Sequence, residues 1–388
     1  MARVAASVQT GRPPAREIAK ASVTPLASIF GSGFLIIVPV LETTLGGAAL
    51  FGVIGVCLLA WLVGTAIRHI VAEVEPRIAT RTLSPTILGI DRLADLVIVI
   101  AYVISVALYL RIMAEYIVSF GSDGNDVIER TIASVAVAVI VGVGLTRGFR
   151  GLDMTERFAL VGVLVLTSVL GGTLFFTDLG DALGGTLEIP AVPDVPISEV
   201  LLVLGGIVIT VQGFETVRYL GGEFDAQTRI WASRAAQIIA ASIYIGFVAV
   251  ATPLMGLGTP DGADKDLLDI TERVAPLLGL PLVLAAVFSQ FSAATADTVA
   301  AAGNLTGLFS RLMTDKRAYV LSGVAAIILC WTVDTAVIIA IASRAFAAYY
   351  CLQCIIAMQT SRGLPRRLFY GSLAVVLAAI TLLAQPAG

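Results

Sequence analysis

The sequence contains little charge for its length. Only 14% of its 388 residues are Asp, Glu, Lys or Arg, whereas soluble domains carry about 25%. Hydrophobic residues make up 57% of the chain, and the mean hydropathy is +0.94. This composition excludes a soluble globular domain and argues against nucleic acid as a partner. It predicts an all-α polytopic protein surrounded by a lipid bilayer.

Residues with metal-binding or catalytic chemistry are scarce. His69 is the single histidine, and the four cysteines Cys57, Cys330, Cys351 and Cys354 all fall in apolar runs. They form no paired ligand set, so we expect no metal site. The sequence also has no P-loop, nucleophile elbow or metalloprotease pattern, which argues against an enzyme and an ATP-driven pump. No cofactor is expected, other than Na⁺ or H⁺ as a coupling ion.

Apolar runs of about 20 residues are long enough to cross a membrane as helices. The sequence contains eleven such runs, at 23–42, 46–70, 86–120, 127–146, 155–177, 197–222, 231–257, 275–308, 317–333, 335–360 and 366–384. The first run is too long for a cleavable signal and lacks a small-residue cleavage site after it. We therefore predict about eleven transmembrane helices.

The basic residues indicate how these helices are oriented. Nineteen of the 25 Lys and Arg residues fall in the N-terminal segment and in the even-numbered connections, and only Arg130, Lys265 and Arg273 fall on the opposite side. Basic loops stay cytoplasmic. We therefore expect a cytoplasmic tail at 1–22, an inside N-terminus and an outside C-terminus. The expected location is a bacterial cytoplasmic membrane.

Glycine-containing motifs interrupt two of the apolar runs. The first is Ile29 to Leu35, with the letters IFGSGFL, and the second is Gln212 to Glu215, with QGFE. A broken membrane helix survives only where it lines an enclosed cavity. The motifs lie about half a chain apart, in the first and sixth helices. This arrangement predicts two inverted repeats of five helices, at 23–180 and 197–360, with 366–384 as an additional helix.

The same motifs resemble the amino acid, polyamine and organocation (APC) superfamily of transporters. Residues 29–35 are similar to its helix-1 pattern IIGSGIF, and Pro39 and Gly46-Gly47-Ala48 match residues that follow it. In helix 6 the resemblance rests on Gly213-Phe214-Glu215, the later Glu223 and the basic Arg229. The resemblance implies the leucine-transporter fold and an activity like that of an amino acid permease.

Carried over to these positions, the resemblance makes the amides of Gly31, Ser32 and Gly33, next to Phe30, a binding site for a substrate carboxylate. A helix N-terminus offers free N–H donors and about half a positive charge to such an anion. The alternative is that the two glycines only permit close helix packing. Gly213, Phe214 and Glu215 are expected to complete the substrate site.

Glu215 is the strongest candidate for the transport mechanism. It is expected to pair with a substrate amino group, or to take up and release a proton as the site alternates between faces. The alternative is a permanent ion pair with Arg344 or Arg218, because ionisable groups inside a span usually face a partner or the bundle interior.

Helix 8 carries a polar run with a second spanning carboxylate. By resemblance to sodium-coupled proteins of this fold, Ser292, Thr295 or Asp297 can hold a cation. Hydroxyls in membrane helices more often bond their own backbone or a neighbouring helix. A salt bridge between Asp297 and Arg344 is the further alternative. Elsewhere, Arg111 and Glu115 have the i, i+4 spacing of a helical ion pair.

These observations predict a secondary active transporter of an amino acid or related small amine. It would work by alternating access, coupled to protons or sodium or acting as an exchanger. One alternative is a cation carrier of the same fold. Another is a non-transporting sensor or partner subunit, since the sequence lacks the aromatic residue that the family often has before the helix-6 acid. The oligomeric state is not predicted.

Overall fold

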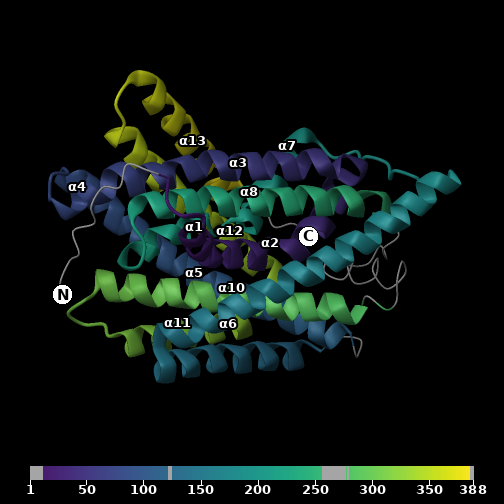
Figure 1. Ribbon diagram of the computed structural model, residues 1–388, viewed down its shortest axis with the longest axis horizontal. Coiled ribbons are helices and arrows are strands. Elements are labelled where there is room, and N and C mark those ends of the chain that lie inside the picture. The colour runs from purple at the N-terminus through teal and green to yellow at the C-terminus, as the bar shows by residue number, and fades with distance from the viewer. Residues whose placement is uncertain (1–11, 121–124, 256–276, 278, 385–388) are drawn as a thin grey trace.

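The computed structural model describes residues 12–120, 125–255, 277 and 279–384. Within these ranges every regular element is a helix, and the long helices form one bundle (Figure 1). The elements are α1 (Ala15–Ala21), α2 (Val23–Leu45), η1 (Gly46–Ala48), α3 (Ala49–His69), the π-helix η2 (Ile70–Val74), α4 (Glu75–Ala79), α5 (Pro85–Ser119), α6 (Asp126–Gly184), α7 (Ile197–Gly206), η3 (Val208–Val211), η4 (Phe214–Gly222), α8 (Ala226–Ala251), η5 (Thr252–Leu254), α10 (Gly279–Leu308), α11 (Asp315–Thr332), α12 (Thr335–Thr360) and α13 (Leu364–Leu383).

Helices lie over all the apolar runs that the sequence predicts as spans. In the described residues, eight stretches are both long and apolar enough to cross a membrane. Two of them, Asp126–Thr146 and Arg157–Gly184, belong to α6, which covers two predicted spans. These two parts of α6 run in different directions in Figure 1. The chain is therefore a multi-pass, all-helical membrane protein, while the inverted repeat remains a prediction.

Side-chain caps determine where several of these helices begin. Ser84 accepts a hydrogen bond from a backbone amide of the first turn of α5, and Asn125 does so for α6. Asp225 and Thr314 cap α8 and α11 in the same way. Each cap satisfies amides that the first helical turn leaves without an intrahelical partner. The polar residues between apolar runs thus fix the turns of the bundle.

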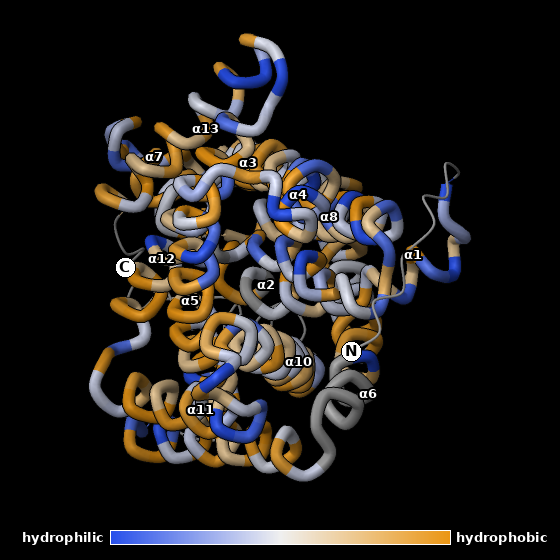
Figure 2. The backbone as a smooth tube through the Cα atoms, turned by 90° about the vertical axis from the view of Figure 1, so that its left-hand side faces the viewer, coloured by the Kyte–Doolittle hydropathy of each residue, from blue (hydrophilic) through white to orange (hydrophobic). Residues whose placement is uncertain are grey.

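Two helices, α5 and α10, occupy the middle of the bundle. They pack extensively against each other and against α6, and in addition α10 packs against α2 and α5 packs against α12. Figure 2 views the bundle from the end that carries α4, where hydrophilic residues mark the turns and apolar residues cover α6 and α11 at the periphery. Large exposed apolar side chains on these outer helices, such as Phe158, Val165 and Ile328, suit contact with lipid.

The break predicted in the sixth helix is confirmed. Helix α7 ends at Gly206, short 3-10 turns follow, and Gly213 has a φ of +126° that favours glycine. Backbone groups freed by the break find side-chain partners: Ser343 of α12 donates to the Gly206 carbonyl, and Thr216 donates to the Gly213 carbonyl at 2.7 Å. The break is therefore buried in protein, as a membrane interior requires.

The break predicted in the first helix is wrong, because α2 is a continuous α-helix through Ile29 to Leu35. Its two glycines instead permit close packing. A Cβ on Gly31 would overlap Ala293 of α10, and one on Gly33 would overlap the Thr210 carbonyl at the broken helix. Inside a helix, their amides point at carbonyls four residues earlier. The carboxylate site on these amides therefore stays a prediction.

Gly31→Ala is expected to destabilise the protein by about 1–3 kcal/mol, because the added methyl meets a rigid neighbour rather than a flexible side chain. Gly55→Ala is the matched control, since a Cβ at Gly55 of α3 has open space around it. Thermal unfolding of the purified variants measures both effects. If the two variants melted at the same temperature as the unmodified protein, the packing role of Gly31 would be wrong.

Candidate functional site

Helix α5 carries polar residues at three levels of the bundle. Asp91 lies near its start, Tyr102 and Ser105 near its middle, and Arg111 near its end, and all four are buried. At 1.5 Å per residue, Tyr102 lies about 16 Å from the first level and about 14 Å from the last. The middle level faces the broken helix, whereas the outer two carry ion pairs.

Glu215 occupies the middle level, directly after the break, and is fully buried. Its carboxylate accepts hydrogen bonds from the hydroxyl of Tyr350 at 2.7 Å, the hydroxyl of Tyr102 at 3.2 Å and the amide of Gly213 at 2.8 Å. No cationic side chain of the described residues lies within ion-pair distance of it. Three helical segments therefore position a buried carboxylate with neutral hydrogen-bond donors.

Aromatic rings surround this carboxylate. Phe214 stacks on Tyr350 with centroids 5.2 Å apart, and Phe346 packs edge-on against Tyr102 at 5.8 Å. Tyr219 also contacts the Tyr102 ring, at 6.2 Å. The sequence lacks the aromatic residue that the family often has before the helix-6 acid. In the structure, Tyr102 of α5 and Tyr350 of α12 bring aromatic rings to this acid. These rings exclude water from Glu215.

Gln212 lies at the break and adds a second polar group to the middle level. Its Nε2 donates to the hydroxyl of Tyr109 at 2.6 Å, while its Oε1 is buried without a hydrogen-bond partner among the described residues. A buried acceptor without a donor costs about 1–3 kcal/mol. Such a group is well suited to receive an N–H donor from a ligand.

Asp297 of α10 is, like Glu215, a fully buried carboxylate. Ser28 of α2 donates to one of its oxygens at 3.1 Å, and Ser105 of α5 donates to the other. The carboxylate and two hydroxyls thus join three helices next to the packed glycines of α2. Oxygen groups of this kind suit a small hard cation or a proton.

The other predicted coupling residues are placed differently. Thr295 donates to the carbonyl of Phe291 in its own helix at 2.7 Å, and Ser292 is buried on α10. Arg344 donates two hydrogen bonds to the Ala384 carbonyl after α13, at 2.7 and 3.1 Å. The permanent ion pair expected between Arg344 and Glu215 is therefore wrong, because that guanidinium points at a helix end.

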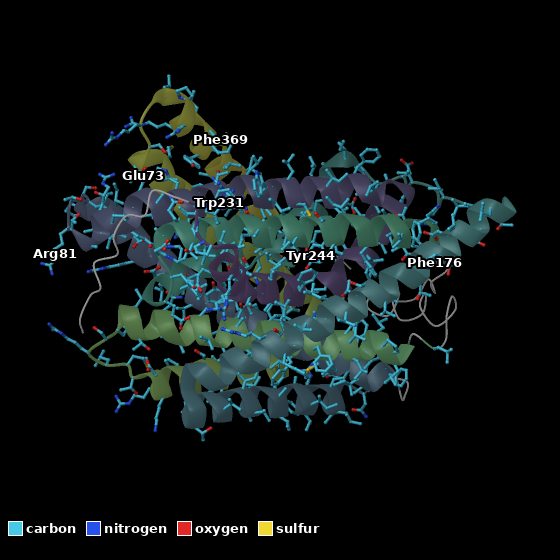
Figure 3. The ribbon with its side chains drawn as sticks, in the orientation of Figure 1. Glu73, Arg81, Phe176, Trp231, Tyr244 and Phe369 are labelled. Carbon is cyan, nitrogen blue, oxygen red and sulfur yellow. The ribbon has the colours of Figure 1, made fainter. Side chains whose placement is uncertain are left out.

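The predicted substrate residues of the first helix are only partly brought together with Glu215. Phe30 is buried and packs edge-on against Tyr244 of α8, with ring centroids 5.6 Å apart. The Tyr244 hydroxyl donates to the Ile29 carbonyl at 2.6 Å, and Figure 3 shows this tyrosine in the middle of the molecule. The side chain of Ser32 lies outside the described part of the structure.

Buried ion pairs form the level of α5 at the end that carries α4. Arg218, from the segment after the break, lies 3.1 Å from Asp91, 3.8 Å from Asp95 and 3.9 Å from Glu75. Arg229 of α8 pairs with Glu75 at 2.6 Å. The alternative of an ion pair between Arg218 and Glu215 is thus wrong, because Arg218 belongs to the ion-pair network at the level of Asp91.

A second network lies at the opposite end of α5. Arg111 pairs with Asp126 at 2.9 Å and with Glu115 at 3.7 Å, which confirms the predicted i, i+4 pair. Arg130 extends this network to Asp126 at 2.6 Å. Glu215 and Asp297 therefore lie between two sets of ion pairs, which connect the helices at either end of α5.

Sequence reasoning missed several residues of this site. Tyr102 and Tyr350 bond Glu215, and Ser28 and Ser105 bond Asp297, yet none of the four stands in a recognisable motif. Their only signal is a polar group inside an apolar run. That signal is weak because such hydroxyls commonly bond their own backbone, as Ser105 also does at 2.9 Å.

Comparison with known proteins adds three findings. A family model described as "APC superfamily transporter" matches residues 13–384. An uncharacterized protein of Aquifex aeolicus (strain VF5) is 33% identical over 346 residues, which cover 88% of this chain and 83% of that protein. The structure is similar to that of Mhp1, a nucleobase-cation-symport-1 family transporter in a closed conformation with bromovinylhydantoin bound. The TM-score is 0.58, with 15% identity over 95% of this chain and 91% of that one.

Proposed function

This chain belongs to the APC superfamily of transporters, and on that premise we propose that it carries an amino acid or related small amine by alternating access. Membership makes it a secondary transporter with a small-molecule substrate and not an enzyme, and the likeness to Mhp1 supports the leucine-transporter-like fold.

Glu215 carries the proposal. A fully buried carboxylate without a cationic partner in the described residues is costly. An ammonium group of a substrate would supply the missing positive charge. The unpaired Gln212 Oε1 offers a further acceptor at the same level. Tyr102 and Tyr350 would hold the carboxylate in place until a substrate displaces one of them.

Asp297 is the proposed coupling residue. Its carboxylate and the hydroxyls of Ser28 and Ser105 come from α10, α2 and α5, so a proton or sodium ion bound there would change how these helices pack. Helix α2 contacts Asp297 through Ser28 and the broken helix through Gly33, so occupancy of one site would be transmitted to the other. The predicted cation ligands Ser292 and Thr295 lie on the same helix.

The two ion-pair networks are the proposed barriers on either side of the substrate. Alternating access requires that one end opens while the other stays closed. Arg218 belongs to the segment directly after Glu215, so movement of this segment would separate Arg218 from Asp91 and expose the carboxylate. At the other end, separation of Arg111 from Asp126 would open the second barrier.

A ligand screen tests the substrate class. The purified protein is heated with amino acids, amines, carboxylates or inorganic cations, with and without sodium, at acidic and neutral pH. A ligand at 100 times its dissociation constant stabilises the folded state by about 2.7 kcal/mol. We expect stabilisation by amine-containing compounds, with sodium or pH dependence that identifies the coupling ion.

The other outcomes of this screen would contradict the proposal. Stabilisation by inorganic cations alone would favour a cation carrier, in which Glu215 and Asp297 hold the cargo. No stabilisation by any compound would favour a sensor or partner subunit that retains the fold. Glu215→Gln provides the control, because an amine bound elsewhere would stabilise this variant as well as the unmodified protein.

A further inference from the structure

A polar cavity of about 660 Å³ lies at the end of the bundle that the basic residues predict to be cytoplasmic. His69 and Arg77 line it from α3 and α4. Ser361 and Arg362 line it from the turn before α13, and Arg366 and Arg367 from the first turn of that helix. Figure 3 shows Glu73, another lining residue, and Phe369 of α13 at this same end of the molecule. The cavity is remote from the α5 level that holds Glu215.

The charge of this cavity is strongly positive. Four arginines face one acid, Glu73, so the lining carries a net charge of +3 with His69 neutral. None of the four arginines has an acidic partner within ion-pair distance in the described part of the chain. Arg367 donates to the Ser361 carbonyl at 3.1 Å. Arginines that lack acidic partners and converge on one cavity are suited to bind a phosphate.

Two neutral groups support the same ligand class. Ser361 is 2% exposed, and its hydroxyl has no hydrogen-bond partner among the described residues. The hydroxyl of Thr360 contacts Nε2 of His69 at 2.9 Å and fixes the imidazole at the cavity wall. Helix α13 begins at Leu364, so its N-terminal turn adds a positive dipole end beside the arginines.

An apolar groove of about 580 Å³ continues from the polar cavity along α12 and α13. Gln359 and Arg367 line both spaces, and Met358, Leu368 and Val375 line the groove alone. A free phosphate would not bind in this apolar groove. A phospholipid would place its headgroup among the arginines and an acyl chain against the apolar residues.

We propose that the cavity and groove between α12, α13 and the end of α3 bind an anionic phospholipid from the cytoplasmic leaflet. Basic pockets between membrane helices on this side of the bilayer are suited to such headgroups. The bound lipid would join α13 to α3 and α4, and α3 is followed directly by the segment that carries Glu75 of the Arg218 network. The site is independent of the substrate that the protein carries.

Native mass spectrometry and thermal unfolding of the full chain in detergent test this inference. Short-chain phosphatidylglycerol, phosphatidylcholine and inorganic phosphate are the three probes. Arg362→Gln/Arg366→Gln removes two arginines that are exposed on the surface, so folding should be unaffected. We expect phosphatidylglycerol binding to weaken by at least about tenfold, because both arginines attract the anionic headgroup.

Two controls separate the cavity from general surface charge. Arg311→Gln/Lys316→Gln removes the same charge from the exposed α10–α11 turn and should leave binding unchanged. Ser372→Trp fills the apolar groove from an exposed position and should weaken phosphatidylglycerol binding without removing charge. Equal loss in both double variants would overturn the inference. So would equal stabilisation by phosphatidylcholine, or an equal effect of inorganic phosphate, which would assign a free-anion site.

Discussion

Glu215→Gln is expected to reduce amine uptake into proteoliposomes by at least about thirtyfold while the protein remains folded. Glutamine keeps the size of the side chain, and its oxygen can still accept the hydrogen bonds from Tyr350 and the Gly213 amide. Its amide NH2 then faces the Tyr102 hydroxyl, which can accept instead of donate. Glutamine cannot pair with an ammonium ion. Loss of one partner of a buried, hydrogen-bonded charge pair costs about 2–5 kcal/mol, and 1.36 kcal/mol corresponds to a factor of ten.

Glu223→Gln is the matched control, because Glu223 is an exposed acid just after the same segment. Its uptake should equal that of the unmodified protein. Melting temperatures of both variants must be measured alongside uptake. If Glu215→Gln transported normally, or lost stability and uptake in proportion, Glu215 would be a structural residue rather than the amine-binding group.

Arg218→Met is expected to destabilise the protein by about 3–5 kcal/mol. The guanidinium is almost fully buried and neutralises Asp91, Asp95 and Glu75 at the end of the bundle that carries α4. Methionine fills much of the same volume but leaves Asp91 and Asp95 without their countercharge, while Glu75 keeps Arg229. Removal of one partner is the costly way to break such a network. Thermal unfolding should show a large fall in melting temperature.

Second-site substitutions distinguish lost charge balance from lost packing. Adding Asp91→Asn and Asp95→Asn to Arg218→Met removes two of the uncompensated charges and should restore part of the stability. Arg311→Met, at an exposed turn, should have little effect. If the triple variant were less stable than Arg218→Met alone, the ion pairs would not be the source of the stability.

Hydropathy predicted the helical membrane fold because it reflects the bilayer, which acts on every span in the same way. The orientation expected from the basic residues stays a prediction. The break at Gly213 was also predictable, since a glycine flanked by polar Gln212 and Glu215 is unfavourable in a continuous membrane helix. The same reasoning failed at Gly31 and Gly33. Small residues that allow a break also allow close packing, and only the neighbours Ala293 and Thr210 decide between them.

The partners of the buried charges were not predictable from the sequence. Arg344 lies six residues before Tyr350 on α12, so the two side chains point about 120° apart around the helix. Tyr350 reaches Glu215, whereas Arg344 reaches the Ala384 carbonyl. Which residue faces the site depends on how α12 is rotated in the bundle. That rotation follows from packing across the whole core rather than from local spacing.

The binding of a substrate amine by Glu215 is tested most directly by a ligand-bound structure. The most stabilising amine from the ligand screen would be added to the protein before structure determination. The proposal predicts the amine nitrogen within hydrogen-bond distance of the Glu215 carboxylate, with Tyr102 or Tyr350 displaced from it. An amine bound elsewhere, with Glu215 still bonded to both tyrosines and to Gly213, would contradict it.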